Sequence, residues 1–256
     1  MKGTSRKFVT IICVMIAIIM YPIQSTSAHQ MVLKESDMFP ISDHTEKKKV
    51  AYLTFDDGPS RNTIRILDIL DQYEIKATFF VMADSSPEAM QRYKEMIDRG
   101  HTIALHTYTH DYNKIYTSTD VFFENIAKLE KFLKDNFSIE TNILRFPGGS
   151  KNVSSRQYGG PQIMSNIVEK CEELGYRYFD WNVDSKDGIS PHVSVSEIVN
   201  NVLKGAEGKK EAIILMHDIN AMNNTVTALP TIIKGLQKQE FEFDVISDKT
   251  EDVRFK

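Results

Sequence analysis

Two histidines four residues apart, His106 and His110, form the clearest metal-ligand pattern in the chain. They follow a short apolar run that is typical of a buried strand. If the chain turns helically there, both imidazole rings lie on one face, at the separation that a single divalent cation needs. With one carboxylate they would form a two-histidine, one-carboxylate site that leaves coordination positions open for water and substrate. Open sites are catalytic, and these ligand types favour zinc, with cobalt, nickel, manganese or iron as alternatives.

Two adjacent carboxylates, Asp56 and Asp57, end another apolar run and precede Gly58-Pro59. Neighbouring strand residues point to opposite sides, but a bend at the end of the strand can turn both toward one pocket. Asp-Gly-Pro is also ordinary turn chemistry, so the pair by itself leaves a structural role open. In a site, one carboxylate could bind the metal while the other takes a proton from water.

Further ionisable residues follow other apolar runs. Arg145, Asp184 and His217 each stand at or just after the end of a different candidate strand. In sheets of parallel strands, reactive groups collect at the carboxyl ends of the strands. Because five candidate strands end in ionisable residues, we predict that these ends form one site.

The elements that must position this site alternate along the chain from residue 50 onward. Short apolar runs predict strands over 50–55, 77–81, 101–105, 143–145, 177–181, 212–216 and 243–246. Amphipathic stretches predict helices over 61–73, 87–99, 119–134, 161–174, 194–204 and 226–238. Gly100, Gly175 and Gly205 stand where helix C-caps belong. This alternation predicts βαβ units, and hence a single α/β domain with a parallel sheet.

The composition is that of a folded protein with a sizeable core. The 256 residues are 41% hydrophobic and 26% charged, which excludes a disordered, collagen-like or low-complexity chain. With 31 Lys+Arg against 35 Asp+Glu, the net charge of -4 gives no basic excess for nucleic-acid binding. Cys13 and Cys171 alone make neither a disulfide framework nor a thiolate zinc site.

The N-terminus predicts export. A short apolar run over 8–21 is preceded by basic residues and followed by small polar residues that end at Ala28. This pattern predicts a signal peptide over 1–28, then a polar leader or tether over 29–49. An uncleaved N-terminal anchor is the alternative, although the run is shorter than a spanning helix requires. We therefore expect a secreted or cell-envelope-associated protein.

Five short motifs occur in the order found in the polysaccharide deacetylases, which are also called the NodB-homology domain or carbohydrate esterase family 4. They are TFDDGP at 54–59, HTYTH at 106–110, RFPG at 145–148, DSKD at 184–187 and LMH at 215–217. The chain resembles this family over about residues 50–246, and we assign residues 50–256 to the domain. The resemblance implies a distorted (β/α) barrel with about seven parallel strands. It also implies metal-dependent removal of N- or O-acetyl groups from polysaccharides.

The resemblance also implies roles for the motif residues. Asp56 is similar to the catalytic base, and Arg145 to the residue that orients this base. The implied metal ligands are Asp57, His106 and His110.

The remaining roles concern the leaving group and the substrate. His217 resembles the general acid, and Asp184 the carboxylate that pairs with it. Gly148 matches the position whose backbone N–H helps to hold the oxyanion, and Leu215 matches a wall of the acetyl-methyl pocket. Pro147, next to Gly148, is assigned to substrate binding with them.

Two departures from the family pattern affect the substrate groove. Many relatives carry Arg-Pro-Pro-Tyr in the third motif, where this chain has Gly148 in place of the tyrosine. Relatives often place a tryptophan four residues after the aspartate that corresponds to Asp184, and this chain has Gly188 there. Trp181 is nearby, but we expect it in a strand of the core rather than in the groove.

We therefore favour an exported metal-dependent N-deacetylase that acts on N-acetylated amino sugars, with peptidoglycan as the expected polysaccharide partner. Chitin oligomers and acetylxylan are alternative substrates. A carbohydrate-binding pseudoenzyme and a hydrolase of small non-sugar amides are alternative classes. We expect a monomer without a nucleic-acid partner.

Overall fold

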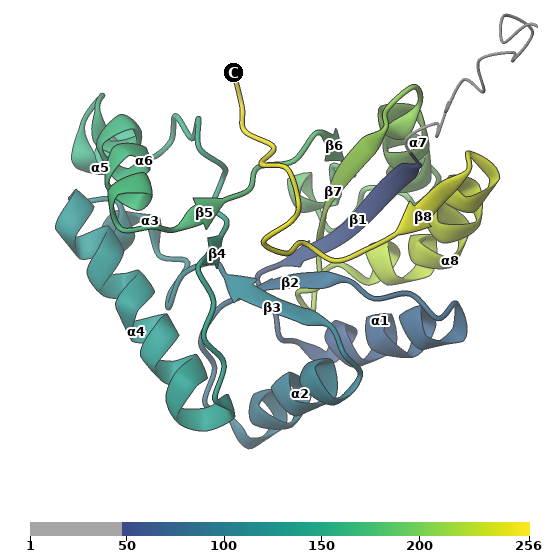
Figure 1. Cartoon of the computed structure of the whole chain (residues 1–256), viewed down its shortest axis with the longest axis horizontal. Coiled ribbons are helices and arrows are strands. Elements are labelled where there is room, and N and C mark those ends of the chain that lie inside the picture. The colour runs from purple at the N-terminus through teal and green to yellow at the C-terminus, as the bar shows by residue number, and fades with distance from the viewer. Residues whose placement is uncertain (1–47) are drawn as a thin grey trace, which may run out of the picture. The chain divides into compact units, whose positions relative to one another are not determined.

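The computed structural model describes residues 48–256, drawn as a ribbon in Figure 1. The predicted signal peptide over 1–28 lies outside the described residues, as does the predicted leader apart from residues 48 and 49. Both therefore stay predictions. In the part that the structure describes, no helix is both long enough and apolar enough to span a bilayer.

The central element is a parallel sheet built around β1 (Lys49–Asp56). β1 pairs with β2 (Thr78–Val81) on one side and with β7 (Glu211–His217) on the other. The strand order is β5-β4-β3-β2-β1-β7-β6, and β8 (Phe241–Phe243) pairs with the first residues of β1. The remaining strands are β3 (Thr102–Leu105), β4 (Ile143–Leu144), β5 (Arg177–Tyr178) and β6 (Val183–Asp184).

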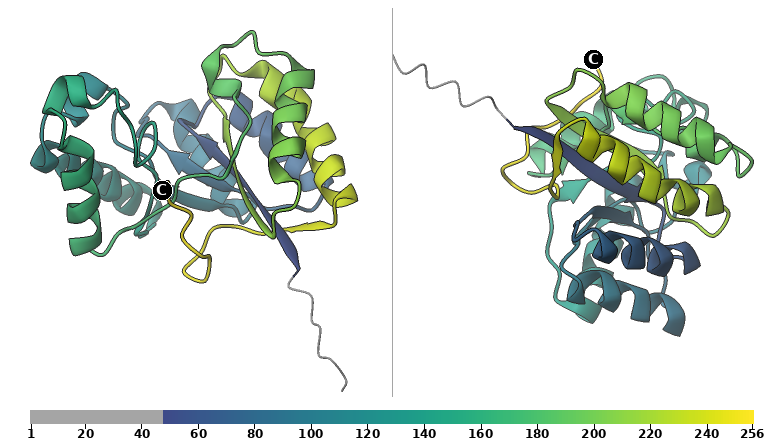
Figure 2. Two further views of the ribbon diagram at one scale, coloured as in Figure 1. Left: turned by 90° about the horizontal axis from the view of Figure 1, so that it is seen from above. Right: turned by 90° about the vertical axis from the view of Figure 1, so that its right-hand side faces the viewer.

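The sheet curls into a half-barrel with helices on its outer face, as Figures 1 and 2 show. Since all its strand pairs are parallel and seven strands form the main path, the predicted distorted (β/α) barrel is confirmed. The long helices are α1 (Arg61–Gln72), α2 (Pro87–Asp98), α4 (Thr119–Phe137), α6 (Ile163–Glu173), α7 (Val195–Ala206) and α8 (Asn223–Lys238). Shorter turns of helix are α3 (Tyr112–Ile115), α5 (Arg156–Gly159) and the 3₁₀ turn Asp187–Ile189.

The two-residue period of the strands separates two cores. In β1, Leu53 and Phe55 belong to the large core that also contains the helices. Tyr52 belongs to a smaller cluster with Phe80 and Ile213 from the two neighbouring strands. Because side chains alternate along a strand, the even-numbered residues of β1 share one face of the sheet. This alternation places the last residue of β1, Asp56, on the same face as the smaller cluster.

Candidate active site

The predicted site residues meet in one cavity of about 360 Å³ at the carboxyl ends of β1 and β7. All of them line this cavity except Arg145, which is fully buried behind it, and Pro147. Of the residues not predicted for the site, the cavity wall also contains Tyr112, Trp181, Lys186, Gly188, Ile189, Ile219 and Met222. Trp181 packs against the smaller core cluster, as predicted, but it lies outside the strands and also lines the cavity, so its predicted place in a strand and outside the groove was wrong.

The two carboxylates reach one cavity because the backbone turns at the end of β1. Asp57 has a φ of 75°, in the left-handed region, so the extended strand ends at Asp56. The N–H group of Asp57 still donates to the carbonyl oxygen of Phe80, 3.2 Å away, which fixes the turn against β2. The predicted bend therefore exists, and it brings both carboxylates to the same cavity.

Asp57, His106 and His110 form a group of three ligand atoms that lie within 4.8 Å of one another. Asp57 Oδ1 is 3.2 Å from His106 Nε2 and 3.5 Å from His110 Nε2. This buried oxygen has no hydrogen-bond partner among the described residues. Two imidazole nitrogens and one carboxylate oxygen match a zinc-type site with open positions, so the residues present fit a divalent cation.

Neighbouring groups set the orientation and charge of these ligands. His106 Nδ1 is 2.8 Å from the carbonyl oxygen of Arg145, so Nδ1 donates to it and Nε2 is the nitrogen that faces Asp57. Burial raises the pKa of Asp57, but His106, His110 and His217 outweigh it and hold this pKa well below its ordinary value. Burial lowers the pKa of His110. Both shifts favour the deprotonated forms that bind a metal.

The two histidines come together without the helical turn that the sequence predicts. Residues 106–110 are irregular, and the rings of His106 and His110 stack with centroids 5.3 Å apart. The side chain of Asn125 holds the loop from α4, because its Oδ1 accepts from the N–H groups of Tyr108 at 2.7 Å and Thr109 at 3.3 Å.

Arg145 holds Asp56 from behind the cavity. Its Nη1 donates to Asp56 Oδ1 at 2.9 Å and to Thr54 Oγ1 at 2.7 Å. Its Nε and Nη2 donate to the carbonyl oxygens of Phe179 at 3.0 Å and Asp180 at 3.1 Å. A fully buried guanidinium with these four partners is a fixed positive charge, and it holds the Asp56 carboxyl in one orientation.

His217 pairs with Asp187, and the prediction of Asp184 as its partner was wrong. His217 Nδ1 is 2.8 Å from Asp187 Oδ1, while Asp187 Oδ2 accepts from the backbone N–H of His217 at 2.8 Å. Asp184 is exposed and accepts from the backbone N–H of Lys186 at 2.7 Å. The physical reason is the turn after β6, because Lys186, with a φ of 59°, reverses the chain and brings Asp187 to His217.

Asp187 raises the pKa of His217. Burial lowers the pKa of His217, but the hydrogen bond and charge of Asp187 outweigh it and raise this pKa to about 9. Burial raises the pKa of Asp187, but its bonds to His217 and Thr225 lower it below its ordinary value. At neutral pH the pair is therefore an imidazolium with a carboxylate, as a general acid requires.

Gly188 packs against the ring of His217. A Cβ at this position would lie 2.7 Å from His217 Cε1. An aromatic platform at this position would displace the ring of His217, so the groove has no room for it there. Leu215, in β7, is buried and lines the same cavity, and its role as a wall of the acetyl-methyl pocket stays a prediction.

Asp218 is a buried carboxylate that the sequence analysis did not assign. Its side chain occupies the place where a Cβ of Gly58 would be, and it accepts from Thr63 Oγ1. Burial raises the pKa of Asp218 to about 7. Ser60 Oγ donates to the backbone carbonyl of Asp218, so the start of α1 is tied to the loop that follows His217.

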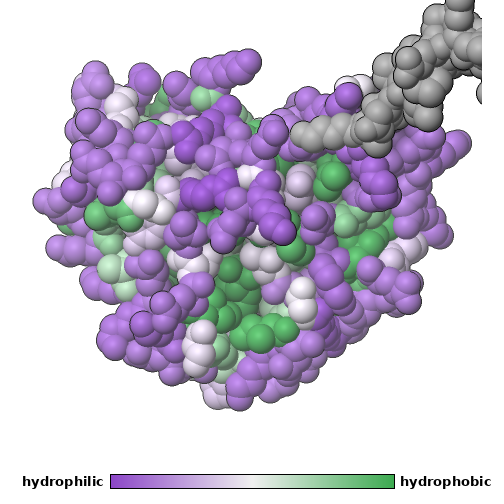
Figure 3. Space-filling view, in the orientation of Figure 1, coloured by the Kyte–Doolittle hydropathy of each residue, from purple (hydrophilic) through white to green (hydrophobic). Residues whose placement is uncertain are grey.

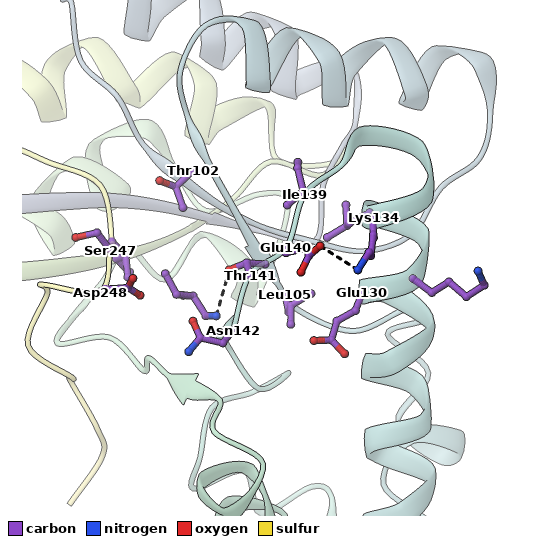
Figure 4. A pocket seen from close by; sticks show the side chains of 14 residues that line it. Thr102, Leu105, Glu130, Lys134, Ile139, Glu140, Thr141, Asn142, Ser247 and Asp248 are labelled. Atoms are coloured by element: carbon purple, nitrogen blue, oxygen red, sulfur yellow. Dashed lines mark hydrogen bonds and ion pairs between the residues drawn. The ribbon is translucent and has the colours of Figure 1, made fainter.

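A separate cavity of about 710 Å³ lies between α4, the start of β4 and the loop after β8 (Figure 4). Lys134 and Glu140, labelled in Figure 4, form an ion pair of 2.9 Å in its wall. Figure 3 shows apolar surface in a hollow near β3, surrounded by hydrophilic residues. None of the predicted site residues lines this cavity.

Known proteins are similar to this chain in both sequence and fold. The family model described as polysaccharide deacetylase matches residues 43–161. A peptidoglycan-N-acetylglucosamine deacetylase of Bacillus cereus is 32% identical over 210 residues, which are 80% of this chain and 72% of that protein. A bifunctional xylanase/deacetylase of Pseudobutyrivibrio xylanivorans is 31% identical over 207 residues, which are 80% of this chain and 31% of that protein.

Among solved structures, the catalytic domain of a peptidoglycan N-acetylglucosamine deacetylase from Eubacterium rectale superposes with a TM-score of 0.76 and 36% identity. The superposition covers 82% of this chain and 93% of that domain. The order of the motifs, the curled sheet and the sequence identity over most of the chain agree. The chain therefore belongs to the polysaccharide deacetylase family.

Proposed function

We propose that the protein is an exported, metal-dependent N-deacetylase that removes acetyl groups from the N-acetylated amino sugars of peptidoglycan. The observation that carries this proposal is the arrangement of three groups in one cavity. The Arg145–Asp56 pair offers a base, the His217–Asp187 pair offers an acid, and Asp57 with the two histidines offers a cation site.

Hydrolysis of an acetamide needs an activated water, stabilisation of the carbonyl oxygen and a proton for the leaving amine. A divalent cation, when bound by Asp57, His106 and His110, supplies Lewis acidity for the first two. Asp56 accepts the proton of the water whose oxygen bonds to the acetyl carbon. His217 gives its proton to the sugar nitrogen as the C–N bond breaks. The products are acetate and a free amino sugar, and no covalent enzyme intermediate forms.

The substrate proposal rests on the relatives. The Bacillus cereus relative and the Eubacterium rectale domain are named as peptidoglycan N-acetylglucosamine deacetylases. The similarity to a bifunctional xylanase/deacetylase favours acetylxylan as the second candidate substrate. Peptidoglycan is the first choice, because a protein with a predicted signal peptide over 1–28 would meet the cell wall after export.

The test is acetate release from peptidoglycan, chitin oligomers and acetylxylan, each with a chelator and then with added Zn²⁺ or Co²⁺. We expect release from peptidoglycan that the chelator abolishes and the metal restores. Full activity of metal-stripped protein would contradict the metal-dependent mechanism. Faster acetate release from acetylxylan than from peptidoglycan would show that the substrate is an acetyl ester rather than an acetamide. For export, cell fractionation should find the protein outside the cytoplasm, and a cytoplasmic location would contradict that part.

A further inference from the structure

Gly148 leaves a space in the cavity wall that a side chain from another element fills. Gly148 has a φ of 74°, and a Cβ built on it would lie 2.7 Å from Tyr112 Oη. The same point lies 2.9 Å from Asn152 Nδ2. Tyr112 is the first residue of α3 and lines the same cavity as the metal-ligand group. Its hydroxyl therefore lies against the point where a side chain at position 148 would begin.

The hydrogen-bond directions leave the proton of this hydroxyl available. Asn152 Oδ1 accepts from the N–H of Ser154 at 2.9 Å, and Asn152 Nδ2 donates to the carbonyl oxygen of Pro147 at 2.9 Å. Asn152 Nδ2 and Tyr112 Oη both lie beside the point where a Cβ of Gly148 would stand. An amide nitrogen only donates, so this nitrogen cannot accept the phenol proton, and Tyr112 keeps its O–H for another acceptor.

A second donor lies beside it. In residues 48–256, the backbone N–H of Gly148 donates to no protein acceptor, and the O–H of Tyr112 has none either. The ring of Tyr112 has its centroid 5.2 Å from that of His110, so the phenol lies between the ligand group and Gly148. Two unpaired donors thus share one wall of the cavity, next to the cation site.

We propose that Tyr112 is a further catalytic residue, whose phenol O–H donates a hydrogen bond to the carbonyl oxygen of the scissile acetyl group, alongside the N–H of Gly148. The inference rests on the proposed function. As the water oxygen adds to the acetyl carbon, negative charge grows on the carbonyl oxygen, and a fixed donor at this position stabilises the transition state more than the ground state. Tyr112 keeps its proton throughout. A hydroxyl group from α3 thus lies beside Gly148, which has no side chain of its own.

The variant Tyr112→Phe removes the hydroxyl and retains the ring, which packs edge-on against Tyr116 with centroids 5.1 Å apart. We expect kcat on the acetylated substrate to fall about 10²-fold, the lower end for loss of one oxyanion donor, with KM within about twofold of the wild type. Zinc affinity should not change. Tyr158→Phe is the matched control, because Tyr158 lies on α5 outside this cavity, and it should keep the wild-type kcat.

Acetate binding to the zinc-loaded protein, measured by calorimetry, tests the same contact without turnover. We expect Tyr112→Phe to bind acetate about tenfold more weakly than the wild type and Tyr158→Phe to bind it equally well. An unchanged kcat or an unchanged acetate affinity in Tyr112→Phe would overturn the assignment. If the wild type releases no acetate from any of the three substrates, the proposed function fails, and acetate affinity alone then decides whether Tyr112 contacts a carboxylate oxygen.

Discussion

At the scale of single residues, the site separates two carboxylates that are neighbours in the sequence. Asp56 accepts from a fully buried arginine, whereas Asp57 faces two imidazoles and has an oxygen without a hydrogen-bond partner among residues 48–256. One is therefore equipped to take a proton, and the other to bind a cation. The assignment of these roles stays a prediction.

Asp187 gives a prediction on pH dependence. The pKa of His217 is raised to about 9, so the acid form is present at neutral pH and is lost as the pH rises through that value. Asp187→Asn removes the charge that raises this pKa, while burial continues to lower it. We expect the alkaline limb of the kcat/KM profile to move to lower pH, with zinc content unchanged. Profiles from about pH 6 to 10.5 would check this.

Asp184→Asn is the matched control for that experiment, because Asp184 is bonded to the backbone of Lys186 rather than to His217. Its alkaline limb should superimpose on that of the wild type. If Asp184→Asn moves the limb and Asp187→Asn does not, the pairing in the structure is not the one that acts in catalysis.

At this scale, the motifs predicted the pairing of Arg145 with Asp56 but not the partner of His217. The types and order of the residues predicted a metal group, a base and an acid, and these residues line one cavity. His217 pairs with Asp187 rather than with Asp184 because of the left-handed turn at Lys186. No residue type at that position requires such a turn. Tyr112 was missed because α3 has only four residues, too few for a helical period to be recognised.

At the scale of elements, most predicted strands occur in the structure, including the two-residue strands β4 and β5, but β6 and the position of the last strand were not predicted. The predicted strand over 50–55 corresponds to β1, and all of 212–216 lies in β7. β6 was missed, since it has two residues and no apolar run. The last strand lies at Phe241–Phe243 rather than at 243–246, because Ile246 is buried in the smaller core and its N–H donates to Thr78 Oγ1 at 2.9 Å.

The ends of the helices were also predicted only in part. Gly100 and Gly175 have left-handed φ values just after α2 and α6, as predicted for residues that follow a C-cap. Gly205 was predicted to end a helix, but it lies inside α7. A Cβ there would lie 2.9 Å from Val183 Cγ1, so this glycine permits close packing of α7 on β6. The sequence alone does not distinguish this use of glycine from a cap.

The link between α1 and the loop after β7 leads to a prediction on stability. Thr63 Oγ1 donates to Asp218 Oδ2 and accepts from the N–H of Ser60 at 2.7 Å. Thr63→Val keeps the shape of the side chain but leaves both buried groups without this partner. We expect the free energy of unfolding to fall by about 1–3 kcal/mol, measured by urea denaturation. Thr227→Val, whose hydroxyl is exposed on α8, is the control. Equal stability of the two variants would show that the link contributes nothing.

At the scale of the whole molecule, the curl of the sheet brings distant parts of the chain to one site. The proposed metal ligands come from the ends of β1 and β3, the partner of the proposed base from the end of β4, and the proposed acid from the end of β7. Because a cation held by Asp57, His106 and His110 binds only the folded chain, it should stabilise the whole domain.

Zinc should therefore raise the melting temperature of the metal-stripped protein. A ligand at 100 times its dissociation constant contributes about 2.7 kcal/mol. His110→Ala removes one of the three ligand atoms, so its melting temperature without metal should stay close to that of the wild type, while the zinc-induced rise should shrink. His192→Ala, in an exposed loop, is the control and should keep the full rise. An identical rise in His110→Ala would place the metal elsewhere.

The central claim is that Asp56 acts as the base of a metal-dependent N-deacetylase. The most direct measurement counts acetate released and free amino groups formed on peptidoglycan, with zinc content determined on the same samples. We expect equal amounts of both products for the wild type, and a rate lower by about 10²–10⁴-fold for Asp56→Asn at unchanged zinc content. Loss of zinc in Asp56→Asn, or an unchanged rate, would contradict it.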